Sequence, residues 1–179
     1  NQSLQDSTIL PVLSPKVVKE TQTENEEVAA TDNNKLVTYD DSEFWLTFED
    51  GTKVHLNYNT TLKYPSHFST VSRTVYLDGE AYFEVAKDSL NRFVVQAGDL
   101  AVEALGTSFN VKAYEEDNQA VVTLFQGKVK TSVGRDEAFL LPDQAVTYLK
   151  NKGQLKKSTL NDAYRACLWR NNELAFNDE

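Results

Sequence analysis

The sequence predicts an all-β protein: an antiparallel sandwich, or a solenoid-like stack of sheets, made of short strands and hairpins with one short helix near the C-terminus. From about Leu36 onward, apolar and polar residues alternate over most of the 179-residue chain, and this two-residue period is typical of half-buried strands. All seven glycines fall between apolar runs and none inside one. Glycine in such positions marks turns, so the sequence predicts many short strands.

Two Asp-Gly pairs predict tight hairpins. Asp50-Gly51 and Asp78-Gly79 each lie between two alternating apolar runs. A tight hairpin turn needs a positive φ, which glycine adopts at low cost. We therefore expect two antiparallel strands to meet at each pair.

Further strands are predicted by short runs that glycine, proline or acidic residues separate. These runs are 93–97, 100–105, 109–114, 120–126, 128–133, 138–141 and 144–149. Only Asn161 to Trp169 has a helical pattern, and Leu174 and Phe176 alternate after it as a last short strand. Short strands without long intervening helices favour a sandwich or stacked sheets over a parallel α/β fold.

Residues 1–35 differ from the rest of the chain. They are polar, carry Pro11 and Pro15, and have only short apolar clusters. We interpret them as a linker or loosely docked arm, with an edge strand laid on the domain as the alternative. Residues 36–179 then form one β domain, a common domain size.

Charge and cysteine content exclude several classes of protein. The chain has 18 basic and 27 acidic residues and a formal net charge of -9, which disfavours nucleic acid as a partner. Cys167 is the only cysteine, so the chain can form no internal disulfide and no zinc site built on paired cysteines. No stretch approaches the roughly 18 apolar residues of a membrane-spanning helix.

Candidate catalytic and ligand-binding residues each have a simpler interpretation. Glu80 and Glu84 could act as a glycosidase pair, but strand alternation favours a solvated face or an ion pair with Arg73 across the second hairpin. His55 and His67 lack the spacing of a metal site and are expected on the surface. We expect no catalytic residue, metal ion or cofactor, and so no enzyme.

Cys167 and a set of aromatic residues each allow a functional and a structural interpretation. Cys167 lies in an apolar context where a free cysteine acts as a small buried group. The aromatic residues Trp45, Tyr58, Tyr64, Tyr76 and Tyr82 could line a sugar-binding face. Cross-strand packing of Tyr76 against Tyr82 is the simpler interpretation, but a carbohydrate-binding β-sandwich module remains the alternative function.

Several motifs resemble the FecR family. Asp50 to Asn57 reads DGTKVHLN and is similar to the family's DGTxVxLN opening, and Val75 to Ala86 (VYLDGEAYFEVA) to its VxLxGEAYFEVA signature. Residues 105–111 (LGTSFNV) and 124–129 (LFQGKV) resemble the LGTxFNV and LxxGxV elements, and residues 169–176 the WxxxxLxF tail. Asp143 departs from the pattern, since the family usually has glycine there.

The matching residues are expected to serve mainly the fold. The family-motif residues are Asp50, Gly51, Leu56, Asn57, Gly79, Glu80, Phe83, Glu84, Gly106, Thr107, Phe109, Gly127 and Trp169. Inward faces are predicted for Leu56, Leu77, Phe83, Val85, Phe109, Val111, Val122, Leu124 and Val129. The signature names no active site.

The resemblance implies a transmembrane anti-sigma regulator. A cytoplasmic segment outside this chain would hold an extracytoplasmic-function sigma factor, and one helix would tether the protein to the inner membrane. This chain would lie in the periplasm and receive a signal from the periplasmic domain of a TonB-dependent outer-membrane transducer. Residues 1–35 would be the juxtamembrane stalk. Because the chain has no methionine, we expect an upstream part that could include the anchor.

The resemblance also implies that many relatives continue into a small C-terminal module of the secretin and TonB type, and we expect that module to be absent from residues 1–179. Without a catalytic constellation, the domain is expected to scaffold a protein contact, with an exposed strand edge as one way to make it. A purely structural spacer is a third option.

Overall fold

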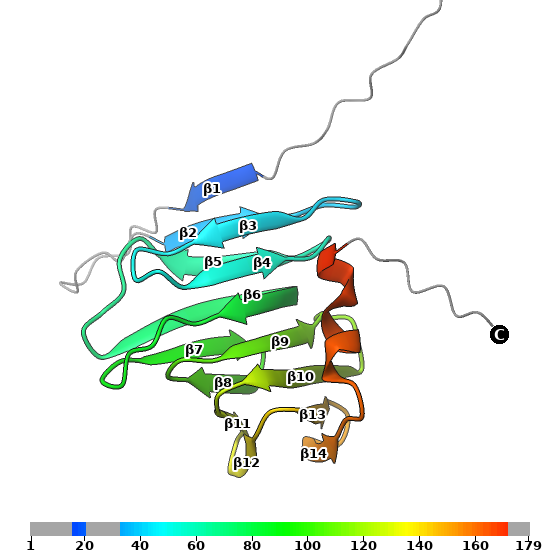
Figure 1. The fold of residues 1–179 in the computed structure, drawn as a ribbon. Coiled ribbons are helices and arrows are strands. Elements are labelled where there is room, and N and C mark those ends of the chain that lie inside the picture. The colour runs from blue at the N-terminus through cyan, green and yellow to red at the C-terminus, as the bar shows by residue number, and fades with distance from the viewer. Residues whose placement is uncertain (1–15, 21–32, 172–179) are drawn as a thin grey trace, which may run out of the picture.

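The computed structural model describes residues 16–20 and 33–171 of the chain (Figure 1). These residues form fourteen strands and one 3-10 helix near the C-terminus. The predicted all-β class and the single short C-terminal helix are confirmed. Leu174 and Phe176, predicted as a last strand, lie outside the described residues, as does most of the predicted arm.

The strands form two sheets that share one long strand, β6. Sheet A has the spatial order β12 (Asp136–Leu140), β11 (Val129–Val133), β8 (Leu100–Ala104), β7 (Arg92–Ala97), β6 (Ser72–Glu84), β5 (Thr61–Pro65), β2 (Asn33–Val37) and β1 (Lys16–Glu20). Sheet B has the order β14 (Gln154–Thr159), β13 (Gln144–Leu149), β10 (Gln119–Gln126), β9 (Ser108–Ala113), β6, β4 (Lys53–Leu56) and β3 (Phe44–Thr47). These neighbours are antiparallel except β6 and β7, which run parallel.

The predicted hairpin at Asp78-Gly79 is wrong, because both residues lie inside β6. The first half of β6 pairs with β5 and β7 in sheet A, and the second half pairs with β4 and β9 in sheet B. Gly79 has a φ of +128°, and a Cβ there would collide with Thr60. Glycine therefore lets the strand change sheets where another segment crosses close to its backbone.

The hairpin predicted at Asp50-Gly51 is confirmed between β3 and β4. The amide of Phe48 donates to the carbonyl of Thr52 at 2.8 Å, and Gly51 has a φ of +87°. A related turn joins β12 to β13, where Asp143 has a φ of +65°. A short polar side chain tolerates this left-handed conformation, which explains why the FecR pattern usually has glycine there.

One core fills the space between the sheets. All nine residues predicted to face inward are buried in it, and the rings of Phe83 and Phe109 stack at 5.1 Å. β5 and β14 were not predicted from the sequence, and β1 and β2 lie where the sequence analysis gave an edge strand only as the alternative to a linker. In β14 only Leu155 is partly buried, so the strand carries almost no alternating apolar signal.

Candidate functional site

The polar residues of three separate motifs meet in one buried network. Glu80, on β6, is 7% exposed. Its Oε2 accepts a hydrogen bond from Asn57 Nδ2 at 3.0 Å, and its Oε1 accepts one from Asn110 Nδ2 at 2.9 Å. Asn57 follows β4 and Asn110 lies on β9, so the carboxylate joins three segments of sheet B.

The surroundings of Glu80 satisfy most of its polar atoms. Its amide donates to Thr60 Oγ1 at 3.0 Å, and its carbonyl accepts from the amide of Asn57 at 2.9 Å. Burial raises the pKa of the Glu80 carboxyl, while the hydrogen bonds from Asn110 and Asn57 oppose this shift. A buried carboxylate whose two oxygens both accept hydrogen bonds serves to hold strands together.

Glu80 was expected on a solvated face or paired with Arg73, and the structure contradicts both. Beyond Gly79, residues 80–83 are all buried, because sheet B is covered on both faces. Arg73 instead forms an ion pair with Asp50, with 2.7 Å between Nη1 and Oδ2. Glu84 is partly buried, and its Oε1 lies 3.8 Å from Nη2 of Arg170.

A row of side chains crosses the outer face of sheet B. The strand registers place its members opposite one another: Trp45 on β3, His55 on β4, Tyr82 on β6, Asn110 on β9, Thr123 on β10 and Ala145 on β13. All of them except Trp45 are buried. An outward-facing row is buried only when another element lies on it.

The 3-10 helix η1 (Ala163–Asn171) covers this row. In Figure 1 it runs along one side of sheet B, coloured orange to red. Trp169 Nε1 donates a hydrogen bond to Asn110 Oδ1 at 3.3 Å, and the buried residues of η1 are Ala163 and Cys167. The helix therefore joins the Glu80 network through Asn110.

His55 lies between two tryptophans. Its ring stacks on Trp45 at 4.2 Å and lies 4.7 Å from the Trp169 ring, and its Nε2 is 2.7 Å from Glu43 Oε2. Burial lowers the pKa of His55, and the contact with Glu43 opposes that shift. The expectation that His55 is a surface residue is wrong, because it is 1% exposed, whereas His67 is exposed as expected.

Arg170 lies over two aromatic rings of the same row of side chains. Its guanidinium lies 3.4 Å from the centre of the Tyr82 ring and 5.4 Å from that of Trp45. Cations over aromatic faces are attracted to the ring electrons. We call the contacts of Trp169 and Arg170 with His55, Tyr82 and Asn110 the C-terminal clamp.

The remaining motif residues also make internal contacts. Leu56, Phe83 and Phe109 belong to the core. Thr107 is buried, and a Cβ on Gly127 would lie 2.8 Å from the carbonyl oxygen of Gly106, so the LGT and LxxGxV elements approach closely. Asp50 Oδ2 accepts from Thr52 Oγ1 at 2.9 Å as well as pairing with Arg73.

The aromatic residues considered for sugar binding do not share one face. Tyr82 is buried beneath Arg170, while Tyr64 packs against Phe48. The predicted cross-strand pair of Tyr76 and Tyr82 is wrong, since both lie on β6, in different sheets. Replacing Tyr82 would therefore remove a buried packing residue.

Among the described residues, the thiol of Cys167 is the remaining candidate for a reactive group. Burial raises the pKa of the Cys167 thiol, which donates to the carbonyl of Tyr164 at 3.2 Å. Within residues 16–20 and 33–171, no three histidine, cysteine or acidic side chains are grouped to hold a metal ion. No helix in this part of the chain is long and apolar enough to cross a membrane.

The sequence interpretation identified Glu80, Asn57 and Trp169 but missed Asn110, His55, Glu43 and Arg170 as parts of the site. A signal existed for Asn110, because it is a polar residue inside the apolar run Phe109 to Val111. Arg170 had no such signal. Its role depends on how η1 lies on a sheet formed by distant residues.

The chain belongs to the FecR family. The family profile, described as FecR protein, matches residues 34–130, which is more than half of the 179 residues. The matched region contains the whole Glu80 network except its link to Trp169. No curated protein matches the chain.

Two solved structures are similar over most of this chain. Both are described as crystal structures of a candidate anti-sigma factor from Parabacteroides distasonis, at 2.50 Å and 1.65 Å resolution. Each is 33% identical, with TM-scores of 0.75 and 0.74, and the matches cover 78% and 77% of this chain. The matched part is 65% of each of those chains, so they contain substantial sequence outside it.

Proposed function

We propose that this chain is the extracytoplasmic signalling part of an anti-sigma regulator and performs no reaction itself. Membership of the FecR family and the likeness to candidate anti-sigma factors support this role. In this proposal the domain lies in the periplasm, and the full-length protein is tethered to the inner membrane. A cytoplasmic part outside this chain holds the sigma factor.

The proposed signal comes from the periplasmic domain of a TonB-dependent outer-membrane transducer and passes to an extracytoplasmic-function sigma factor. One observation carries the proposal most directly. The polar residues of the FecR motifs bind one another and η1, so they hold an element in place and leave no open reactive group. A helix docked in this way can change its contacts when a partner binds. This property suits a domain that transmits a signal.

We also propose that the transducer contacts the free edge of β3. Among the described residues, sheet B ends in β3 and β14, and sheet A ends in β12 and β1. β14 carries Lys156 and Lys157, β12 carries Asp136 and Glu137, and β1 carries two lysines and a glutamate. Charged residues of this kind protect natural edges. β3 reads FWLT and has no charged residue, so a partner strand can extend it.

The backbone of β3 supplies the donors for such a contact. The amide of Phe48 donates to the carbonyl of Thr52 at 2.8 Å. Because hydrogen-bonded pairs alternate in an antiparallel ladder, Phe44 and Leu46 also face β4. The amides of Trp45 and Thr47 then face the free edge, and Trp45 is 49% exposed.

Binding between the full periplasmic region and the transducer's periplasmic domain tests the proposal. In a pull-down we expect capture of the wild-type region and loss of capture with Thr47→Pro, which removes an edge amide without removing a bond to β4. Thr47→Val keeps the amide and should bind normally. Equal capture by both variants would refute the β3 contact, and no capture of the wild type would refute the transducer as partner.

A further inference from the structure

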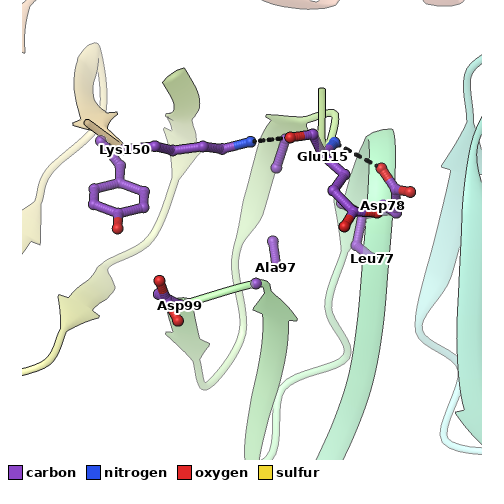
Figure 2. Close-up of a pocket in the computed structure, with 9 residues that line it drawn as sticks. Leu77, Asp78, Ala97, Asp99, Glu115 and Lys150 are labelled. Carbon is purple, nitrogen blue, oxygen red and sulfur yellow. Dashed lines mark hydrogen bonds between the residues drawn. The ribbon is translucent and has the colours of Figure 1, made fainter. Parts of the chain in front are cut away.

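A hollow opens at one end of the sandwich, between the two sheets (Figure 2). Its volume is about 430 Å³, within the range of pockets that bind small ligands. Residues of β6, the turn between β7 and β8, the end of β9 and the end of β13 line it. It is separate from the C-terminal clamp and shares no residue with it.

The inner wall of the hollow is apolar. Leu77, Ala97, Ala113 and Tyr148 line it, and each is at most 8% exposed. Leu77 and Ala97 come from sheet A, while Ala113 and Tyr148 come from sheet B. A ligand that enters here would therefore bury an apolar stem between the sheets.

The mouth of the hollow is acidic. Asp78, Asp99 and Glu115 line it and are exposed, and Figure 2 shows Asp99 on the turn opposite the strand that carries Asp78. Asp78 Oδ1 accepts from the amide of Glu115 at 2.9 Å. The side chain of Asp99 makes no hydrogen bond or ion pair that is recorded within the described part of the chain.

One cation, Lys150, is among the lining residues. Its Nζ donates to the backbone carbonyls of Tyr114 at 2.7 Å and Glu115 at 3.1 Å, as the dashed line in Figure 2 indicates for Glu115. The ammonium group is thus held by backbone oxygens. The three carboxylates outnumber it, so the mouth attracts a positive group and repels an anion.

Tyr148 offers a polar group at the apolar wall of the hollow. Its side chain is buried, with the residue 5% exposed, and it lines the hollow. No hydrogen bond to its hydroxyl is recorded among the described residues, and the hydroxyl is not one of the enclosed polar atoms that lack a partner. The oxygen therefore keeps some accessible surface and is available to a group that enters the hollow.

A second hollow, of about 280 Å³, adjoins the first and shares Asp78 and Glu115 with it. Glu116 adds another acid to this neighbour. Together the two hollows form an acidic track across the end of the sandwich. A track of this kind fits an extended segment with more than one basic side chain better than it fits a single free cation.

We propose that this track binds a basic segment of a partner protein, with an arginine side chain inserted in the larger hollow. The aliphatic stem would pack on Leu77 and Ala113, and the guanidinium would bind the Asp99 carboxylate and the Tyr148 hydroxyl. Arginine suits the site because it carries five donors and an apolar stem. A metal ion suits it less, since no metal-binding group of three side chains exists among the described residues.

The inference goes beyond the proposed function, because it names the chemistry of a second contact and holds whichever protein supplies the segment. The test is NMR titration of the ¹⁵N-labelled full chain with a capped Gly-Arg-Gly-Arg-Gly peptide. The comparison peptide carries citrulline, which is neutral and nearly the same shape, in place of arginine. We expect saturable shifts at Gly98, Asp99, Glu115 and Tyr148 with the arginine peptide only.

Three variants distinguish binding of the peptide in the hollow from non-specific electrostatic attraction to an acidic chain. Asp99→Asn should weaken binding by about fivefold, as expected for one exposed ion pair, and Tyr148→Phe should weaken it without changing the melting temperature. Asp143→Asn removes the same charge at the other end of β13 and should leave binding unchanged. Asparagine tolerates the left-handed backbone at that position.

Four results would overturn the proposal. They are no binding, equal shifts with the citrulline peptide, equal weakening by Asp143→Asn and Asp99→Asn, and shifts at the same amides from calcium ions alone. The β3 pull-down is independent of these outcomes, since Thr47 does not line either hollow.

Discussion

Trp169 Nε1 donates a hydrogen bond to Asn110 Oδ1 at 3.3 Å, linking residues that are 59 positions apart in the sequence. Asn110 also donates to Glu80 at 2.9 Å, so η1 is bonded to the centre of sheet B through one amide side chain. The FecR motifs therefore build both a sheet and the place where the following helix docks.

Trp169→Phe should destabilise the domain by about 1 kcal/mol, the usual net contribution of one hydrogen bond. The substitution keeps an aromatic ring beside His55 but removes the donor to Asn110. Urea unfolding followed by circular dichroism measures the change. Trp45→Phe is the matched control and should cost less, because Trp45 is 49% exposed and donates no hydrogen bond that the structure records. Equal stability of Trp169→Phe and wild type would contradict the clamp.

Asn110→Ala should cost more, roughly 2 to 3 kcal/mol, because it leaves a buried carboxylate without one of its donors. Burial already raises the pKa of Glu80, and losing the Asn110 hydrogen bond raises it further. A raised folded-state pKa gives stability that is complete below the unfolded pKa of about 4.5 and lost as the pH rises through the folded pKa.

The deficit of Asn110→Ala relative to wild type should therefore grow between pH 4 and pH 7. Urea midpoints measured across that range give the deficit at each pH. Asn118→Ala, at an exposed turn, is the control and should show a small, constant difference. A deficit that shrinks with rising pH would exclude the proposed role of Glu80.

His55 should make the domain less stable in mild acid. Burial lowers the pKa of His55 despite its contact with Glu43, and Arg170 contributes in the same direction as burial. As the pH falls, the unfolded chain therefore takes up this proton before the folded chain does. The contribution of His55 to the free energy of unfolding is complete above the unfolded pKa of about 6.5, and it is lost as the pH falls through the folded pKa.

Thermal unfolding between pH 7.5 and pH 5 measures this effect. His55→Gln should lose less stability over the range than wild type does. His67→Gln replaces the other histidine of the chain, whose side chain is 84% exposed, and should follow the wild-type curve. The prediction fails if the two variants behave alike.

Gly79→Ala should destabilise the domain by roughly 3 kcal/mol or more, because backbone strain and overpacking add. The φ of Gly79 is +128°, and a Cβ there collides with Thr60. Gly153→Ala is the control: its φ is +59°, and no atom lies within 4 Å of the added Cβ, so about 1 to 2 kcal/mol is expected. Similar losses in both variants would show that β6 does not need glycine for its passage between sheets.

Local patterns in the sequence predicted the strands well where one face meets the core. Asp50-Gly51 forms the expected hairpin, because turn chemistry is local. Asp78-Gly79 has the same letters but lies within β6. A Cβ on this glycine would collide with Thr60. Only the tertiary structure shows that Thr60 approaches β6 at the position where the strand passes from one sheet to the other.

The site was harder to predict than the fold. His55 alternates as an outward-facing residue, and it does face outward from sheet B. It is buried because η1, more than a hundred positions later in the chain, lies over it. Strand periodicity reports which face a residue is on, and it cannot report what covers that face.

Reporter activity of the sigma factor, in cells that carry the full-length regulator, tests the signalling role most directly. The activity is measured with and without inducer for the wild type and for a regulator that lacks residues 43–178, at matched protein levels. The account predicts that the wild type responds to inducer and that the deletion abolishes the response. An unchanged response after the deletion would contradict it.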